Sequence, residues 1–204
     1  LMNEGGITRR LFALASILVG RFTGGLAHVN ILASFMMGGM SGSSAGDVAA
    51  TTKTLVPQME RHGYDKAFSC AVTSTSSILA NLLPPSILLM LYGSLAEASI
   101  GKLFMAGILP AIVLTLSLMV IVHVISVKNG YKGEDTPVNK ERVLADARSA
   151  LWAFPMPLII LGGIRFGITT PTEAAGVAAA YAFLVGTFVY GEIKLSSLPR
   201  IIWV

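Results

Sequence analysis

Met40-Ser41-Gly42-Ser43-Ser44-Ala45-Gly46-Asp47 is the stretch that decides how the first third of this chain folds. It closes an uncharged segment, residues 22–46, which six glycines divide, and a second short segment over residues 48–58 follows it. Neither arm supplies the run of about 20 apolar residues that a helix needs to cross a bilayer. Two short arms around a glycine- and serine-rich tip are typical of a re-entrant helical hairpin, and we predict one here.

The charges of the whole chain are few and clustered. Of 204 residues, 15 are Lys or Arg and 11 are Asp or Glu, so 13% are charged, against about 25% in soluble domains. Uncharged runs cover residues 22–46, 67–96, 103–127 and 174–191. This pattern argues against a soluble enzyme and predicts an all-α, polytopic protein of the lipid bilayer. The net charge of +4 is too small and too dispersed to indicate a nucleic-acid surface.

The segments after the hairpin are predicted to cross the membrane. Residues 67–96 are long enough, but Pro84-Pro85 interrupts them, so we expect a broken transmembrane helix with irregular backbone over residues 81–86. The further crossings that we expect are residues 103–127, 151–164 and 174–190.

We divide the chain into a connecting interfacial helix (1–30), the hairpin with the broken helix (31–96), and connecting transmembrane helices (97–204). Cations gather around residues 60–66 and in the hydrophilic loop 128–148, which the positive-inside rule places in the cytoplasm. The hairpin is then expected to enter from the cytoplasmic side and return to it. The chain lacks an initiator Met and stops as an apolar run begins, so we expect a fragment of a longer protein.

The tip and the proline break are the two segments that suggest a binding site. At a hairpin tip, the first amides of the second arm attract anions, and the last carbonyls of the first arm can coordinate a cation such as sodium. The hydroxyls of Ser41, Ser43 and Ser44 can serve either ion. The hydroxyl-rich run from Ser74 to Ser86 leaves carbonyls unpaired where Pro84-Pro85 breaks the helix, which membranes tolerate only beside protein or water.

Each of these features also has a structural interpretation. Ser44 and Asp47 fit a capping box, and the spacing of Gly38, Gly42 and Gly46 fits close helix packing. The break can be a proline kink whose hydroxyls bond back to their own helix. Thr170, Pro171 and Glu173 read as a capped helix start. The three histidines have no metal-ligand spacing, so we assign them no metal and expect no cofactor.

Two alternative functions remain open at this point. Gly39-Met40-Ser41-Gly42 matches the short G-x-S-G of intramembrane serine proteases, with His123 as a conceivable base. A membrane scaffold subunit without a site is the other alternative.

Several motifs in order resemble the large membrane subunit of the tripartite ATP-independent periplasmic (TRAP) transporters. The tip motif Met40–Asp47 and Pro84-Pro85-Ser86 are two of them. The others are Met2–Leu11, Gly24–Asn30, Arg61–Asp65 and Thr170–Ala175. The similarity covers nearly the whole chain, and several motifs in register are more specific than any one.

This resemblance implies a sodium-coupled secondary transporter in the bacterial inner membrane that imports small organic acids of the C4-dicarboxylate or sialic-acid type. A periplasmic binding protein would deliver the substrate, and a small membrane subunit would support the large one. The family fold has two inverted repeats, each with a hairpin and a broken helix, and works as an elevator. The chain resembles the first repeat with connecting helices.

The resemblance also implies roles for single residues. Sodium would bind at Ser41, Gly42, Ser43 and Asn81. The substrate would contact Ser43, Ser44, Asn81, Pro85 and Ser86. Auxiliary or capping roles would fall to Asp47, Thr170 and Glu173.

Overall fold

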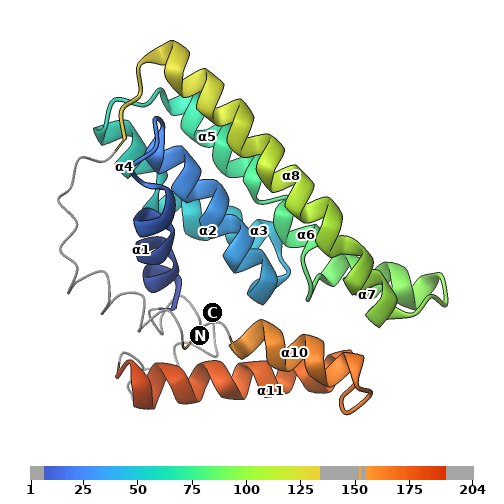
Figure 1. Cartoon of the computed structure of the whole chain (residues 1–204). Coiled ribbons are helices and arrows are strands. Elements are labelled where there is room, and N and C mark those ends of the chain that lie inside the picture. Colours follow the sequence, from blue (N-terminus) through green and yellow to red (C-terminus); the bar gives the residue numbers. More distant parts are fainter. Residues whose placement is uncertain (1–6, 134–151, 153–154, 192–204) are drawn as a thin grey trace.

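Every regular element that the structure describes is a helix. The structure is a computed structural model, and it describes residues 7–133, residue 152 and residues 155–191. The all-α prediction is therefore confirmed for this part of the chain. The helices of Figure 1 are α1 (Ile7–Val19), α2 (Gly25–Ser41), α3 (Ser44–Thr54), α4 (Val56–Arg61), α5 (Lys66–Ser76), α6 (Leu79–Leu82), α7 (Ile87–Leu95), α8 (Ile100–Asn129), α10 (Pro155–Arg165), α11 (Pro171–Leu184) and the π-helix η1 (Val185–Val189).

The two predicted short arms form a helix–turn–helix. α2 ends at Ser41, the chain turns at Gly42 and Ser43, and α3 runs back along α2 toward α4 (Figure 1). Gly42 has φ +60°, which glycine adopts without steric cost, and its N–H donates to Gly38 O at 3.2 Å to close α2. With 17 and 11 residues, the arms are about 25 Å and about 16 Å long, shorter than a bilayer core.

α5, α6 and α7 form the predicted broken helix. α5 and α6 make one arm, with a turn at Ser77 and Ile78 that was not predicted. The backbone then becomes irregular from Leu83 to Ser86, and α7 leaves at 44° to the first arm. The break follows from Pro84 and Pro85, whose missing N–H groups cannot continue a helix.

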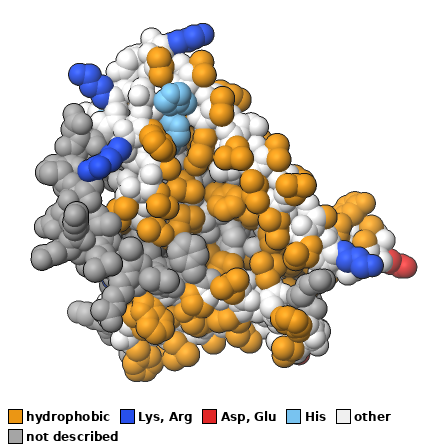
Figure 2. Space-filling view, viewed as in Figure 1, with side chains coloured by type: hydrophobic (Ala, Val, Ile, Leu, Met, Phe, Trp, Pro, Cys, Tyr) orange, Lys and Arg blue, Asp and Glu red, His pale blue; other side chains and the backbone are white. Residues whose placement is uncertain are grey.

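α8 is, among the described helices, the one that is long and apolar enough to cross a membrane by itself. The bent pair of α5–α6 with α7 would be a second if counted as one span. α8 has 30 residues, about 45 Å of helix, and Pro110 lies inside it. Leu109, Leu116 and Val120 are 69%, 58% and 63% exposed. Figure 2 shows such apolar side chains covering this face, which suits contact with lipid rather than water.

The cation-rich segment at residues 60–66 and residues 128–133 lie at the same end of the described bundle. Tyr64 stacks on Tyr131 with 4.4 Å between ring centroids, and the Asp65 amide donates to the Tyr131 hydroxyl at 3.1 Å. The amide of Gly24, just before α2, donates to Tyr131 O at 3.0 Å. The helix–turn–helix of α2 and α3 therefore begins and ends at the same end of the described bundle.

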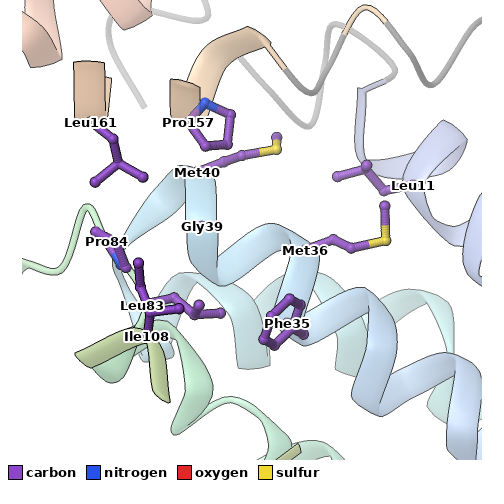
Figure 3. Close-up of a pocket in the computed structure, with 10 residues that line it drawn as sticks. All are labelled: Leu11, Phe35, Met36, Gly39, Met40, Leu83, Pro84, Ile108, Pro157 and Leu161. Carbon is purple, nitrogen blue, oxygen red and sulfur yellow. The ribbon is translucent and has the colours of Figure 1, made fainter. Parts of the chain in front are cut away.

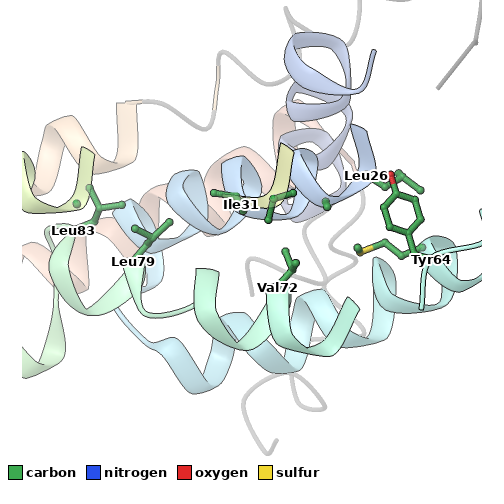
Figure 4. Packing of buried hydrophobic residues seen from close by; sticks show 10 residues of the cluster. Leu26, Ile31, Tyr64, Val72, Leu79 and Leu83 are labelled. Atoms are coloured by element: carbon green, nitrogen blue, oxygen red, sulfur yellow. The ribbon is translucent and has the colours of Figure 1, made fainter. Parts of the chain in front are cut away.

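α2 is the central helix of the described bundle. It packs against α1, α5, α6 and α8, and most of its residues are buried. Leu26 and Ile31 of α2 meet Val72 of α5 and Leu79 of α6 in one apolar cluster (Figure 4). This packing supports the hairpin along its length and positions its tip.

α10, α11 and η1 correspond to the last two predicted crossings. α10 has 11 residues and α11 has 14, and η1 adds five more. Their apolar residues Ile160 and Ala178 join Met37 and Ala50 of the hairpin in a second cluster. Of the predicted loop 128–148, residues 128 and 129 belong to α8, and residues 134–148 lie outside the described residues.

Candidate functional site

The hairpin tip lies directly against the proline break. A Cβ built on Gly42 would overlap the carbonyl oxygen of Pro85 and lie 2.9 Å from its carbonyl carbon and 3.2 Å from Ser86 Cα. The Ile87 N–H donates to Gly42 O at 3.3 Å. Two segments that are about forty residues apart are thus joined backbone to backbone, and only glycine fits at this position.

Four helix ends meet at this contact. α2 and α6 end there at Ser41 and Leu82, and α3 and α7 begin there after their caps, Ser43 and Ser86. The free N–H groups at a helix start carry partial positive charge, and the free carbonyls at a helix end carry partial negative charge. The arrangement can therefore favour an anion and a cation side by side.

The serines of the tip divide into capping and available hydroxyls. Ser43 Oγ accepts from Gly46 N at 3.3 Å and is the N-cap of α3. Ser41 Oγ accepts from Ser43 N at 3.5 Å, and Ser41 and Ser44 are half-buried. The predicted capping box is wrong because the cap is Ser43 and not Ser44, and Asp47 makes no capping hydrogen bond.

The predicted site residues of the break lie beside the tip, but they differ in whether their polar groups are already used in hydrogen bonds. Ser86 is fully buried, and its hydroxyl donates to Asn81 O at 2.7 Å and accepts from Leu89 N at 3.2 Å. Asn81 and Pro85 are half-buried. The Ser86 hydroxyl is thus occupied in holding the break, whereas Pro85 presents its carbonyl to Gly42.

Thr170 and Glu173 form a capping box at the start of α11, as predicted. Glu173 N donates to Thr170 Oγ1 at 3.3 Å, and the Glu173 carboxylate accepts from Thr170 N at 2.8 Å and Thr170 Oγ1 at 2.9 Å. These hydrogen bonds, from the Thr170 backbone first and its side chain second, hold the pKa of Glu173 below its ordinary value. Both residues are exposed in the α10–α11 connection, where they perform a structural role.

A buried polar cluster behind the tip was missed by the sequence analysis. It consists of Asn30 and Ser34 of α2, Asp47 and Thr51 of α3, and Ser69, Thr73 and Ser76 of α5, all of them at most 1% exposed. The signal was present, because Asn30 and Ser34 are one turn apart in an apolar helix, and so are Ser69 and Thr73.

An apolar cavity of about 210 Å³ lies on the other side of the tip. Gly39 and Met40 of α2, Pro84 of the break and Pro157 of α10 line it, with Leu11 and Ile108 at its ends (Figure 3). Its lining offers no charged or hydroxyl side chain. The cavity therefore does not suit an organic acid.

The geometry excludes the protease alternative. The His123 ring packs edge-on against His28 at 5.9 Å, and His28 lies in the first turn of α2. Ser41 ends the same helix thirteen residues later, about 20 Å away along the axis. Ser41 and His123 cannot share a proton, so this alternative is wrong.

The chain matches the family model described as "Tripartite ATP-independent periplasmic transporter, DctM component" over residues 1–203. It is 43% identical over 199 residues to the sialic acid TRAP transporter permease protein SiaT of Haemophilus influenzae, covering 97% of this chain and 32% of that protein. It is 40% identical over 201 residues to the C4-dicarboxylate TRAP transporter large permease protein DctM of Pseudomonas aeruginosa, covering 98% and 47%.

A third relative is the isethionate TRAP transporter permease protein DctMQ of Oleidesulfovibrio alaskensis. It is 40% identical over 196 residues, which cover 96% of this chain and 31% of that protein. The chain thus spans about a third to a half of the length of these relatives.

Proposed function

The chain belongs to the DctM family of TRAP transporters, and from this premise we propose that the complete protein is the large permease of a sodium-coupled importer of small organic acids. It resides in the bacterial inner membrane as a multi-pass protein. It works with a small membrane subunit and takes its substrate from a periplasmic binding protein.

The observation that carries the proposal is the contact of Gly42 with Pro85 and Ile87. It brings the ends of α2 and α6 together with the starts of α3 and α7. Carbonyls of the tip and the break, with the hydroxyl of Ser41, supply the oxygen ligands that sodium prefers. The first amides of α3 that its cap does not use, those of Ser44 and Ala45, would bind a carboxylate together with Ser43 and Ser44.

The depth of the tip supports a re-entrant hairpin. A Cβ on Gly107 of α8 would overlap Leu82 O, so α8 passes the break at this level. Gly107 is four residues inside the uncharged stretch that begins at Leu103, about 6 Å along the helix. The break and the tip that touches it then lie within the hydrocarbon layer, where free backbone groups persist only when they are buried in protein or line a water-filled cavity.

Sodium and substrate would depend on each other at this site. A cation offsets the charge of a carboxylate in the low dielectric of the membrane interior, so neither ion binds well alone. The dependence is reciprocal, since each ligand raises the affinity for the other by the same factor. The second half of the relatives' length would supply the facing wall of the pocket and the partner repeat of an elevator.

Uptake into liposomes tests the proposal. The complete protein with its small subunit is reconstituted, and uptake of labelled succinate, N-acetylneuraminate and isethionate is measured in turn. We expect uptake of one of them that requires both an inward sodium gradient and the periplasmic binding protein. No sodium-dependent uptake of an acid that the binding protein demonstrably binds would contradict the proposal.

A pair of serine variants localises the site. Ser43→Ala removes the cap of α3 at the tip, and Ser99→Ala removes the matching cap of α8, whose Oγ accepts from Lys102 N at 3.4 Å. Each loses about 1 kcal/mol of capping free energy. Only Ser43→Ala should weaken sodium and substrate binding together; equal losses in both variants would remove the tip from the site.

A further inference from the structure

The turn between α1 and α2 packs against the C-terminal end of α8. The Gly24 N–H donates to Tyr131 O at 3.0 Å. A Cβ built on Gly133 would overlap Arg21 O and lie 2.7 Å from Phe22 O, so the two backbones are in direct contact. Two segments that are far apart in the chain thus form one corner of the described bundle.

Three rings support this corner. Phe22 packs edge-on against His28 with 6.0 Å between ring centroids, and His28 packs in the same way against His123 of α8 at 5.9 Å. His28 is buried, whereas Phe22 and His123 are exposed. The ring stack therefore fixes the turn beside α8 and leaves Phe22 on the surface.

Three cations surround the corner. Arg21 lies in the turn, Lys128 in the last turn of α8 and Lys132 just beyond that helix, and all three are exposed. In Figure 2, Lys and Arg side chains lie on either side of the histidine side chains at this end of the molecule. Among the described residues, no ion pair joins any of the three cations to an acid.

The two segments that form the corner carry no acidic residue. The sequence contains no Asp or Glu over residues 5–46 or over residues 98–133. Asp65 adjoins the corner, because its N–H donates to the Tyr131 hydroxyl at 3.1 Å, but its carboxylate already accepts from Phe68 N at 3.0 Å. The concentration of positive charge therefore favours an anion that comes from outside the corner.

An exposed apolar stripe of α8 ends directly at these cations. Val120, Val124 and Val127 are exposed and follow one face of the helix, and Lys128 comes next in the chain. The uncharged stretch 103–127 is long enough to cross the hydrocarbon layer, so Lys128 lies where that layer ends. A molecule with an anionic head and apolar chains fits both the cations and the stripe, whereas a soluble anion fits the cations alone.

We propose that this corner binds the headgroup phosphate of an anionic phospholipid, in the leaflet that this end of α8 faces. The Arg21 guanidinium can donate two parallel N–H bonds to the phosphate oxygens, and Lys128 and Lys132 add point charges. The acyl chains run along the valine stripe of α8. Because Arg21 and Lys132 belong to different segments, the bound lipid ties the α1–α2 turn to α8. The inference requires that α8 spans the membrane, but it does not rest on sodium coupling or on the substrate.

Lipid titration of the complete protein with its small subunit tests the site. The delipidated protein in neutral detergent is titrated with phosphatidylglycerol or with phosphatidylcholine of the same chain length. Bound lipid is counted by native mass spectrometry, and the Tm is measured at each lipid concentration. We expect phosphatidylglycerol to bind at lower concentration and to raise the Tm more, since phosphatidylcholine has no net charge. Equal effects of the two lipids on a folded protein would overturn the proposal.

Neutralising the cations one at a time locates the site. Each Lys or Arg near a membrane surface strengthens the binding of anionic lipid by a factor of about five. Arg21→Gln, Lys128→Gln and Lys132→Gln should therefore each raise the half-saturating concentration of phosphatidylglycerol about fivefold, and the triple variant should lose the preference for this lipid. Arg21→Lys keeps the charge without the two parallel bonds, so its effect should be smaller than that of Arg21→Gln. All three side chains are exposed, so the variants should fold.

Lys102→Gln is the matched control. Lys102 is an exposed cation in the first turn of α8, at the opposite end of the same helix. This variant changes the net charge by the same amount and should keep the half-saturating concentration within about twofold of wild type. A loss as large as that of Arg21→Gln would indicate general attraction to the whole protein and overturn the proposal.

The triple variant gives the remaining outcome. If an acidic segment of the small subunit occupied the corner, wild type and the triple variant would respond equally to phosphatidylglycerol, and this result too would overturn the proposal. Neither readout needs transport, so failure of the transport proposal would leave the lipid test unaffected.

Discussion

Replacing Gly42 by Ala tests whether the contact of the tip with the break is tight enough to control ion binding. The backbone at Gly42 has φ +60°, and a left-handed conformation costs a non-glycine residue about 1–2 kcal/mol. The new methyl would also overlap Pro85 O and lie 3.2 Å from Ser86 Cα. Overpacking of this kind costs about 1–3 kcal/mol, and the tip can relieve it only by moving away from the break.

Gly63→Ala separates the two costs. Gly63 has φ +82°, but nothing lies within 4 Å of a Cβ built on it, so its variant carries the conformational cost alone. Since each 1.4 kcal/mol is a factor of ten, the overlap should raise the sodium Kd of Gly42→Ala by about 5- to 150-fold over Gly63→Ala.

The assay is sodium titration of the purified, complete transporter, followed by calorimetry or by a sodium-dependent shift in Tm. Both variants should unfold in a single transition. The comparison of their sodium Kd values then reflects binding and not a difference in folding. A sodium Kd for Gly42→Ala within about twofold of that for Gly63→Ala would refute the reasoning, because the tip could then move without disturbing the ion.

Three further changes have definite expected outcomes in the complete protein. In Gly107→Ala the new methyl would overlap Leu82 O, which should lower stability by about 1–3 kcal/mol. Its control is Gly101→Ala, whose Cβ meets only Ile164 Cγ2 at 3.8 Å, and the Tm of Gly107→Ala should be the lower of the two. Asn30→Ala removes the amide that donates to Thr73 Oγ1 at 2.7 Å and accepts from Ser76 Oγ at 3.3 Å, and it should cost about 1–3 kcal/mol in denaturant titration. Thr170→Ala should cost about 1 kcal/mol by the same titration. The cap of α11 should also weaken in acid, because the pKa of Glu173 is lowered in the folded protein. The stabilisation is present at pH values above the ordinary pKa of Glu and is lost as the pH falls through the lowered pKa. A series of Tm measurements at different pH values would show this loss.

Local sequence signals predicted the elements well. The uncharged run 103–127 predicted α8 although Pro110 lies inside it, because a long apolar segment has few alternatives to a single helix. Pro84-Pro85 predicted the break, and Thr170-Pro171-Thr172-Glu173 predicted the cap of α11. These features depend on neighbouring residues alone.

Features that depend on distant residues could not be predicted in the same way. The fit of Gly42 against Pro85 requires the path of both segments, which no local pattern contains. The choice of Ser43 over Ser44 as the cap follows from where α2 ends and the chain turns. Once Ser43 caps α3, Asp47 lies one position beyond the capping box and faces Ser34, so its burial followed from the tertiary fold.

The most direct test of the sodium-coupled site is the sodium Kd of the complete transporter with and without saturating substrate. The substrate is the acid found in the uptake assay. We expect the substrate to lower the sodium Kd, sodium to lower the substrate Kd by the same factor, and Gly42→Ala to diminish both effects together. A sodium Kd that the transported acid leaves unchanged would contradict the account.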